Sequence, residues 1–315
     1  MTLTQLSAFV LVARLGSVKA AAKALNVSEP AVSQALAALR QHLDDQLIIR
    51  DAAAMTLTSG GARLLPIASQ MVALGAEAQA AVRAAQGRPM QLRLVTTSVI
   101  AEFIAGPLAD AFTRRLGRPV ETSSGVAAAT EMPVLVANRL ADVAIGPEVP
   151  PDPALPVVSE PLFKYRLVAV AGGRGAPRGS LRQWHWLVGP AGSDPDSDIG
   201  KFLAAQRIPE DRIGVCPSNT AAWAAAADGA GVSLAVEHLV GQQLRRGELL
   251  RVDVPGTPVA GCWHATMLDR QQRSGVAGSL RRFLSTPEAM HLMRSPAAGV
   301  PPSRFRPPVY VTIWS

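Results

Sequence analysis

The sequence predicts a chain of three parts: a small helical unit with a short β-wing, one long helix, and a larger α/β domain. Three observations predict this order. Two alanine-rich helical segments lie close together before residue 45, apolar residues repeat at helical spacing over 59–86, and short β-type runs alternate with helical segments after residue 89. With 315 residues, the chain is long enough for two or three domains.

Composition and charge limit the class of protein. Hydrophobic residues make up 48% and charged residues 17%, which fits a chain with sizeable buried cores. The net charge of +7 permits a polyanionic partner, but residues 1–60 carry five basic and four acidic side chains, whereas residues 281–315 carry five basic and one acidic. Charge alone therefore does not mark the N-terminal region as a nucleic-acid reader.

The two cysteines, Cys216 and Cys262, cannot form a disulfide framework. We see no secretory signal and no apolar run of membrane-spanning length, so we expect a cytoplasmic chain.

Cap signals mark two short helices at the start of the chain. Thr4 is expected to cap the first helix and Gly16 to end it. Ser17 is expected to cap the second helix, which runs to about Leu25, and Asn26 suits the left-handed residue that follows a helix. Because the second helix is built mainly of alanine, a neighbouring helix can cross it closely.

A third helix begins almost at once. Ser28 is expected to cap it, and Pro30 lies in its first turn, where a missing N–H has no helical partner. A connection of only three or four residues, 26–28, has the length of a helix-turn-helix, in which the later helix enters the major groove of DNA. A small helical hairpin packed through alanine is the alternative.

Exposed positions of the third helix carry side chains suited to DNA. Gln34 can read adenine with two hydrogen bonds, Glu29 can accept from cytosine, and Ser33 suits a phosphate oxygen. Short β-type runs at 47–49 and 55–58 predict a wing whose arginine reaches the minor groove or the DNA backbone. The candidate DNA-binding residues are Ser17, Lys19, Ser28, Glu29, Pro30, Ser33, Gln34, Arg40 and Arg50.

One long helix is expected from Ser59 to about Gln86. Apolar positions alternate at spacings of three and four residues, as in a coiled-coil seam, at Leu64, Ile67, Met71, Leu74, Ala78, Ala81 and Ala85. The pattern predicts a helix that pairs two subunits; an amphipathic helix packed on its own domain is the alternative. Gly87, Arg88 and Pro89 mark the domain boundary.

The N-terminal residues resemble the LysR-type transcriptional regulators. The matching pattern is Leu6–x–x–Phe9, Val12–Ala13–x–x–Gly16–Ser17, Ala21–Ala22–x–x–Leu25, Ser28–x–Pro30–Ala31–Val32–Ser33, Leu36–x–x–Leu39, Leu43–x–x–x–Leu47, Arg50 and Leu57–Thr58–x–x–Gly61. The chain departs from this family where Glu29 stands at a usual glutamine, Arg40 at a usual glutamate, Asp44 at a usual glycine and Ala53 at a usual second wing arginine. Loss of that arginine is expected to weaken DNA binding and flatten its salt dependence.

The resemblance implies a sequence-specific transcriptional regulator and not an enzyme. It implies a winged helix-turn-helix domain at 1–58, a linker and dimerisation helix at 59–87, an effector-binding domain at 90–290 and a C-terminal extension at 291–315. The expected partners are double-stranded operator DNA, a small-molecule effector, further copies in a homodimer or homotetramer, and RNA polymerase as a further candidate. No cofactor, metal or membrane partner is expected.

The alternation of strands and helices after residue 89 predicts a parallel, doubly wound α/β sheet. The resemblance divides this domain into two lobes that look like periplasmic binding proteins. Lobe one is expected at 90–162 and 267–290, and lobe two at 163–266. Ligands of such sheets bind beyond the carboxyl ends of the strands.

Hydroxyl and amide side chains follow two of the predicted strands and precede helices. With the N–H groups of the helix ends, they can hold an anionic effector across a cleft; ordinary helix capping is the alternative. The candidate effector-binding residues are Thr96, Thr97, Ser98, Thr130, Gly146, Ser218, Asn219 and Thr220.

Motifs for catalysis are absent from the sequence. The five histidines show no metal-binding spacing, and no G-x-S-x-G elbow occurs. The rival interpretation is a bilobal small-molecule-binding protein or an enzyme with an accessory helical domain; the N-terminal helices and the missing export signal argue against it. Retention on heparin or operator DNA that weakens steeply with salt separates the two interpretations.

The C-terminal extension is rich in proline over 295–308 and ends in an apolar run. We expect Val309–Ile313 to form a strand that adds to a sheet edge, because the run is too apolar to stay in water.

Overall fold

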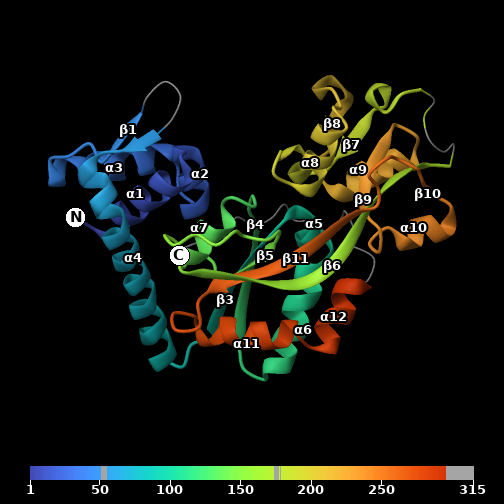
Figure 1. Ribbon diagram of the computed structural model, residues 1–315. Coiled ribbons are helices and arrows are strands. Elements are labelled where there is room, and N and C mark those ends of the chain that lie inside the picture. Colours follow the sequence, from blue (N-terminus) through green and yellow to red (C-terminus); the bar gives the residue numbers. More distant parts are fainter. Residues whose placement is uncertain (51–54, 174–176, 178, 296–315) are drawn as a thin grey trace.

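The computed structural model describes residues 1–50, 55–173, 177 and 179–295. It contains the three expected parts, and Figure 1 shows the N-terminal domain at one end, lobe one in the middle and lobe two at the other end. The wing position Ala53 and the predicted strand at 309–313 lie outside the described residues. Over the ranges that the structure describes, no helix combines the length and the apolar character needed to cross a membrane.

The N-terminal domain comprises α1 (Leu3–Leu15), α2 (Val18–Leu25), α3 (Glu29–Leu43) and a hairpin of β1 (Ile48–Arg50) with β2 (Met55–Leu57). The first cap differs from the prediction: Thr2, not Thr4, caps α1. The hydroxyl of Thr2 accepts from the backbone N of Gln5, while Gln5 Oε1 accepts from the backbone N of Thr2 at 2.8 Å. This reciprocal capping box satisfies two donors and explains why the helix begins early.

The other predicted helix signals are confirmed. Gly16 and Asn26 both take left-handed conformations at the ends of α1 and α2. The side chains of Ser17 and Ser28 accept from the third residue beyond them, at 3.2 and 3.4 Å. These caps keep the connection between α2 and α3 to residues 26–28, so the two helices form the predicted helix-turn-helix.

The core of the N-terminal domain explains how α3 is oriented. Phe9 of α1 and Ala21 of α2 are buried against Val32, Leu36 and Leu39 of α3. Burying each large apolar side chain contributes about 1.5–3 kcal/mol to folding. One face of α3 is thereby buried in the core, and the opposite face is exposed to solvent.

Helix α4 (Ser59–Ala85) begins at a tight joint with the wing. Asp45 Oδ1 accepts from the backbone N of Leu47 at 2.6 Å and from the hydroxyl of Thr58, the N-cap of α4, at 2.8 Å. These hydrogen bonds, the backbone one first, lower the pKa of Asp45 below 3.8. A Cβ at Gly61 would lie 2.1 Å from the carbonyl oxygen of Leu47, so only glycine permits this approach.

The predicted seam of α4 divides into two. Leu64 and Met71 are half-buried against the N-terminal domain. Ile67 and Leu74 are 56% and 62% exposed. The alanines further along the seam are exposed as well. Part of the apolar stripe thus serves the helix's own domain, and the rest faces solvent.

The larger domain carries one mixed sheet in the order β4-β3-β5-β11-β6-β9-β7-β8, with β10 paired to β6. The predicted all-parallel sheet is wrong at its centre, where two long strands run antiparallel to each other. The strands are β3 (Met90–Thr96), β4 (Val120–Val126), β5 (Val143–Gly146), β6 (Val157–Gly172), β7 (Trp186–Val188), β8 (Ile213–Val215), β9 (Val232–Val236), β10 (Leu249–Arg251) and β11 (Val259–Leu268).

Helices cover the sheet, and Figure 1 shows α6, α11 and α12 on the side of lobe one away from the N-terminal domain. Alternating βα units place apolar faces of these helices on the parallel strands of each lobe. The helices are α5 (Ser98–Ile100), the π-helical turn η1 (Ala101–Ala105), α6 (Gly106–Leu116), α7 (Met132–Ala137), α8 (Asp198–Ala205), α9 (Asn219–Ala227), α10 (Gly241–Arg246), α11 (Gly275–Leu284) and α12 (Pro287–Arg294), with 3-10 turns η2 (Leu181–Gln183), η3 (Pro190–Ser193) and η4 (Glu210–Arg212).

Strands β6 and β11 belong to both lobes. Residues 143–146 of β5 pair with the end of β11 in lobe one, while 233–236 of β9 pair with the end of β6 in lobe two. The pairing of β6 with β11 shifts register between Trp263 and His264. Directly after this shift, His264 pairs with Gly146 of β5 in lobe one.

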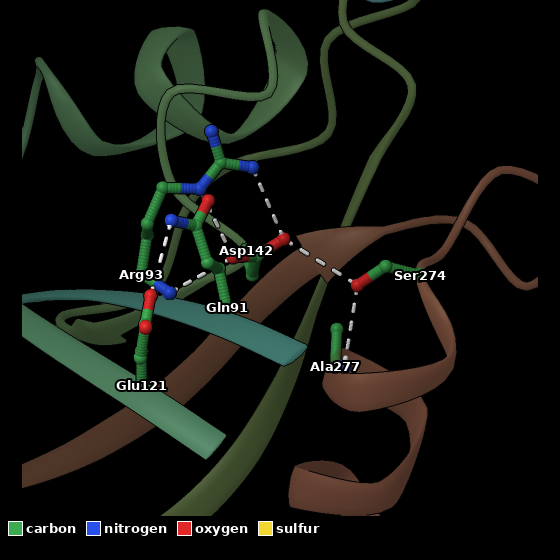
Figure 2. Close-up of polar contacts among 6 residues, drawn as sticks. All are labelled: Gln91, Arg93, Glu121, Asp142, Ser274 and Ala277. Carbon is green, nitrogen blue, oxygen red and sulfur yellow. Dashed lines mark hydrogen bonds and ion pairs between the residues drawn. The ribbon is translucent and has the colours of Figure 1, made fainter. Parts of the chain in front are cut away.

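A carboxylate fastens the parts of lobe one together. Figure 2 shows Asp142 between Arg93 of β3 and Ser274, the N-cap of α11. Asp142 accepts from the backbone N of Arg93 at 2.8 Å and from its Nε at 3.2 Å, and from the Ser274 hydroxyl at 3.4 Å. Since the side chain of Asp142 is only 10% exposed, this ion pair is shielded from solvent and fixes the strand relative to the helix.

The N-terminal domain and lobe one share a hydrophobic core. Buried residues of α1 belong to the same cluster as Met132 and Leu135 of α7. Arg14 Nη2 donates to the carbonyl of Ala154 at 3.2 Å, and Glu77 of α4 pairs with Arg139. The domain that carries α3 thus rests directly on lobe one.

Candidate functional site

The first candidate site is the outer face of α3. Glu29, Pro30, Ser33 and Gln34 are all exposed. Residues four apart on a helix share a face, so Glu29 lies beside Ser33 and Pro30 beside Gln34. This face has the length and the polar side chains needed to contact base edges in a major groove.

The flanking DNA candidates take several roles. Ser17 and Ser28 already cap α2 and α3, so their hydroxyls fix the helix ends. Lys19 is exposed in the first turn of α2, and Arg50 ends β1 at the wing. A helix start with a nearby lysine suits a phosphate.

Arg40, a candidate DNA contact, also binds within its own domain. Its Nε donates to the carbonyl of Gln46 at 2.8 Å and its Nη2 donates to the carbonyl of Ile48 at 3.0 Å. The guanidinium is therefore used to hold the end of α3 to the wing.

The second candidate site is a cavity of about 250 Å³, which we name the interlobe cavity. Lobe one contributes the start of α5, lobe two contributes the starts of α8 and α9, and the shared strands β6 and β11 contribute aromatic rings. Its lining includes Thr97, Ser98, Val126, Tyr165, Leu167, Asp194, Asp198, Asn219, Trp223, Leu234, Val236 and Trp263. Lys23 of α2 also lines it, so the N-terminal domain contributes one side chain.

A buried carboxylate crosses between the lobes beside this cavity. Glu102 of η1 in lobe one is 6% exposed and accepts four hydrogen bonds from the start of α9 in lobe two. Oε1 accepts from the backbone N and side-chain amide of Asn219 at 2.9 and 2.8 Å, and Oε2 accepts from the backbone N and hydroxyl of Thr220, both at 3.0 Å. Next to it, the rings of Phe103 and Trp223 stack across the lobes with centroids 5.2 Å apart.

Tyr165 connects the shared strand β6 to lobe two. Its hydroxyl donates to Asp198 Oδ2 at 2.5 Å, and burial together with Asp198 raises the pKa of this hydroxyl. The ring of Tyr165 lies over Gly261 of β11, where a Cβ would come within 2.4 Å of it. Glycine at this cross-strand position is therefore what allows Tyr165 to face the cavity.

His238 lies at the back of the same strands. Its ring packs against Phe163 and Trp263, with centroids 5.2 and 5.9 Å away. Its Nε2 is buried and has no hydrogen-bond partner among the residues that the structure describes. Burial, which outweighs the opposing effects of Met293 and Glu237, lowers the pKa of this imidazole below 6.5.

Comparison with known families assigns both parts of the molecule. Residues 3–62 match the bacterial regulatory helix-turn-helix protein model of the lysR family, and residues 85–286 match the LysR substrate binding domain model. The chain belongs to the LysR family. Members of this family are DNA-binding transcriptional regulators with an effector-binding domain, and this chain has both domains.

Relatives and solved structures agree with the LysR-family assignment. The chain is 34% identical, over the whole of both chains, to an uncharacterised HTH-type transcriptional regulator of Mycobacterium tuberculosis. ArgP from Mycobacterium tuberculosis is similar in structure, with a TM-score of 0.56 and 22% identity over 91% of this chain and 96% of that one. Full-length CbnR complexed with its target DNA matches with a TM-score of 0.50 and 21% identity over 90% and 99%. The two structures show the shared fold.

In this LysR-family effector domain, three predicted effector residues line the interlobe cavity: Thr97, Ser98 and Asn219. The other five do not belong to its lining. Thr96 is fully buried at the end of β3, Gly146 packs against Met132, and Thr130 lies in the turn before α7, which Glu131 caps. Ser218 caps α9 by accepting from Ala221, and Thr220 is bound to Glu102.

The sequence predicted that the start of α9 could hold an anionic effector, but in the structure these donors are already bound to Glu102. Glu102 supplies the negative charge there, from a position 117 residues away in the chain. Sequence reasoning also missed Tyr165, Asp198 and Trp263, which meet only through strand pairing and helix docking. Asp198 directly follows Ser197, the N-cap of α8, and such a cap is a local signal for a helix start that says nothing about a cavity.

Proposed function

We propose that a small molecule in the interlobe cavity controls how this regulator binds operator DNA. One observation carries the proposal: a single chain joins the exposed face of α3 to a cavity of about 250 Å³ between two lobes. Thr97 and Ser98 are the proposed effector contacts from lobe one, and Asn219 from lobe two. A ligand that touches both lobes favours the lobe arrangement to which it binds best, and so shifts an existing equilibrium.

We further propose that the DNA-binding face of this chain comprises Glu29, Pro30, Ser33 and Gln34, flanked by Ser17, Lys19, Ser28 and Arg50. The exposure of the four residues of α3 supports this assignment. Of these, Gln34 carries an amide that can bind adenine with two hydrogen bonds, while Lys19 suits a phosphate.

The regulator is proposed to act as a homodimer or a homotetramer in the cytoplasm, with RNA polymerase as a candidate partner. The exposed apolar stripe at Ile67, Leu74 and Val82 of α4 supports the pairing of subunits through this helix. Two-fold pairing places two α3 helices on the two halves of a palindromic site.

The test of the function is a footprint on the DNA just upstream of the regulator's own gene, with the purified full chain and candidate metabolites. Replacing Gln34 with alanine is expected to relax base preference at one position, at a cost of about 1–3 kcal/mol. Lys19→Ala serves as the matched control, since it is expected to weaken all sequences alike and reduce the salt slope by about 0.9. A chain that binds no duplex at low salt contradicts the proposal.

A further inference from the structure

The interlobe cavity has a mostly apolar lining, and in the described part of the chain its charged residues are two acids and one lysine. Asp194 and Asp198 line it from lobe two, and Glu102 lies directly behind Asn219. Among the described residues of its lining, the basic side chain is Lys23, which belongs to α2 and is exposed. A carboxylate ligand would therefore meet like charges, and solvent screens the lysine.

The helix end that would attract an anion is already satisfied. Both oxygens of Glu102 accept from the first residues of α9, and the positive end of the helix dipole faces this carboxylate. A second anion there would have to displace a side chain that is 6% exposed and holds four hydrogen bonds. The helix end that the sequence predicted for an anionic effector therefore binds Glu102 of the same chain.

The acids of lobe two retain acceptor capacity. Asp198 accepts from Tyr165 through Oδ2, and Asp194 accepts from the backbone N of Asp196 through Oδ1. Each ionised carboxylate offers about four lone-pair sites, so both can accept further bonds from a ligand. Thr97 and Ser98 add lining from lobe one, on the other side of the cavity from these acids.

The walls of the cavity suit a ligand with an apolar body and a cationic end. Tyr165, Trp223 and Trp263 present aromatic rings, and Leu167 and Val236 present aliphatic groups. Aromatic faces attract ammonium and guanidinium groups through their quadrupole and at the same time bury apolar carbon. At about 30 Å³ per water, 250 Å³ corresponds to about eight waters, so the ligand is compact.

We propose that the effector is a compact organic cation, an amine or guanidinium on an apolar body, whose positive end faces Asp194 and Asp198. This assignment rests on the proposed function of the interlobe cavity. The charged end binds the acids of lobe two, and the aromatic rings and the lining residues of lobe one contact the rest of the molecule. A molecule so placed touches lobe one, lobe two and the strands they share.

The test measures binding to the full chain by thermal shift and titration calorimetry. The probes are agmatine and 2-phenylethylamine, with 3-phenylpropionate and succinate as carboxylates of similar size. We expect saturable stabilisation by at least one of the two cations and none by the carboxylates. We also expect Asp198→Asn to weaken the cation by about tenfold.

Two further variants keep the test decisive. Asp194→Asn, which leaves the Tyr165 contact of Asp198 in place, is expected to weaken the cation as well. Asp196→Asn, an exposed acid of the same loop outside the cavity lining, is expected to leave its affinity unchanged. Stabilisation by carboxylates alone, by neither set of probes, or equally in the aspartate variants overturns the assignment.

Operator footprints with the same probes separate this inference from the proposed function. A cation that binds through Asp198 without altering the footprint upholds the cationic site and overturns the regulatory role of the cavity. A carboxylate that fills the cavity and alters the footprint upholds the regulatory role and overturns the cationic site.

Discussion

Glu102 of lobe one and Asn219 of lobe two meet through a carboxylate oxygen that lies 2.9 Å from the backbone N and 2.8 Å from the side-chain amide N of Asn219. The two residues come from different lobes, so their contact connects bodies whose relative position defines the cavity. A buried charge-assisted contact of this kind is stronger than a neutral hydrogen bond. It fixes the lobes at the inner end of the cleft.

Removal of this carboxylate is expected to destabilise the protein and open an anion site. Glu102→Ala removes four hydrogen bonds from the start of α9, at a cost of about 3 kcal/mol, although the Asn219 amide keeps its bond to Ser98 Oγ. Acetate is expected to recover part of the lost melting temperature, because it can take the vacated position at the helix end. Melting curves in sodium acetate and in sodium chloride of equal ionic strength check this; equal recovery in both salts would contradict the specific site.

A methyl group at Gly261 is expected to disturb the cavity wall. Its Cβ would lie 2.4 Å from the ring of Tyr165, so Gly261→Ala forces that ring aside and costs about 1–3 kcal/mol. Gly275→Ala is the matched control, since nothing lies within 4 Å of the added atom and the change falls in α11. Urea unfolding of both variants measures the difference, and equal stability would show that Tyr165 does not depend on the glycine.

Arg40 is expected to contribute to the stability of the fold and not to the salt dependence of DNA binding. Arg40→Ala removes two hydrogen bonds to carbonyls of the wing and costs about 1–2 kcal/mol of unfolding free energy. The dependence of operator affinity on salt is expected to stay as in the parent chain, whereas a lost phosphate contact reduces the slope by about 0.9. Melting curves and binding at a series of salt concentrations check both quantities. A reduced slope with unchanged melting would restore Arg40 as a phosphate contact.

The buried imidazole of His238 is expected to make stability depend on pH near neutrality. Because its folded pKa lies below 6.5, the unfolded chain takes up a proton first as the pH falls. Stability present above about pH 6.5 is therefore lost progressively as the pH falls through the folded pKa. His238→Phe is expected to remove this loss, while His291→Phe, at an exposed position of α12, should retain it. Urea unfolding between about pH 8 and pH 5 measures the effect; parallel curves for all three proteins would exclude His238 as the cause.

Local signals made the N-terminal domain predictable. The caps at Ser17 and Ser28 and the left-handed Asn26 depend on a few neighbouring residues, so the sequence carries them directly. The start of α1 was misplaced because two threonines, at positions 2 and 4, both offer a hydroxyl. The choice between them depends on Gln5, whose side chain reaches back to Thr2.

Long-range pairing could not be predicted in the same way. The first half of β6 contains Pro161 and β11 contains Gly261, both of which weaken a strand pattern. Their pairing joins segments about a hundred residues apart, and together with the antiparallel pairs β5–β11 and β6–β9 it makes the centre of the sheet antiparallel. The position of Glu102 at α9 has the same origin: its sequence neighbours indicate a helix and give no sign of the residues that it contacts.

The β6–β11 pair continues on both sides of its register shift, so the connection between the lobes is a two-stranded ribbon instead of two loose loops. Its register changes at Trp263 and His264, where the lobes meet, and such an irregularity increases local twist. Both lobes are built onto this one hydrogen-bonded ladder, so any change in the angle between them has to deform it. The β6–β11 pair is therefore the element through which the two lobes are mechanically joined.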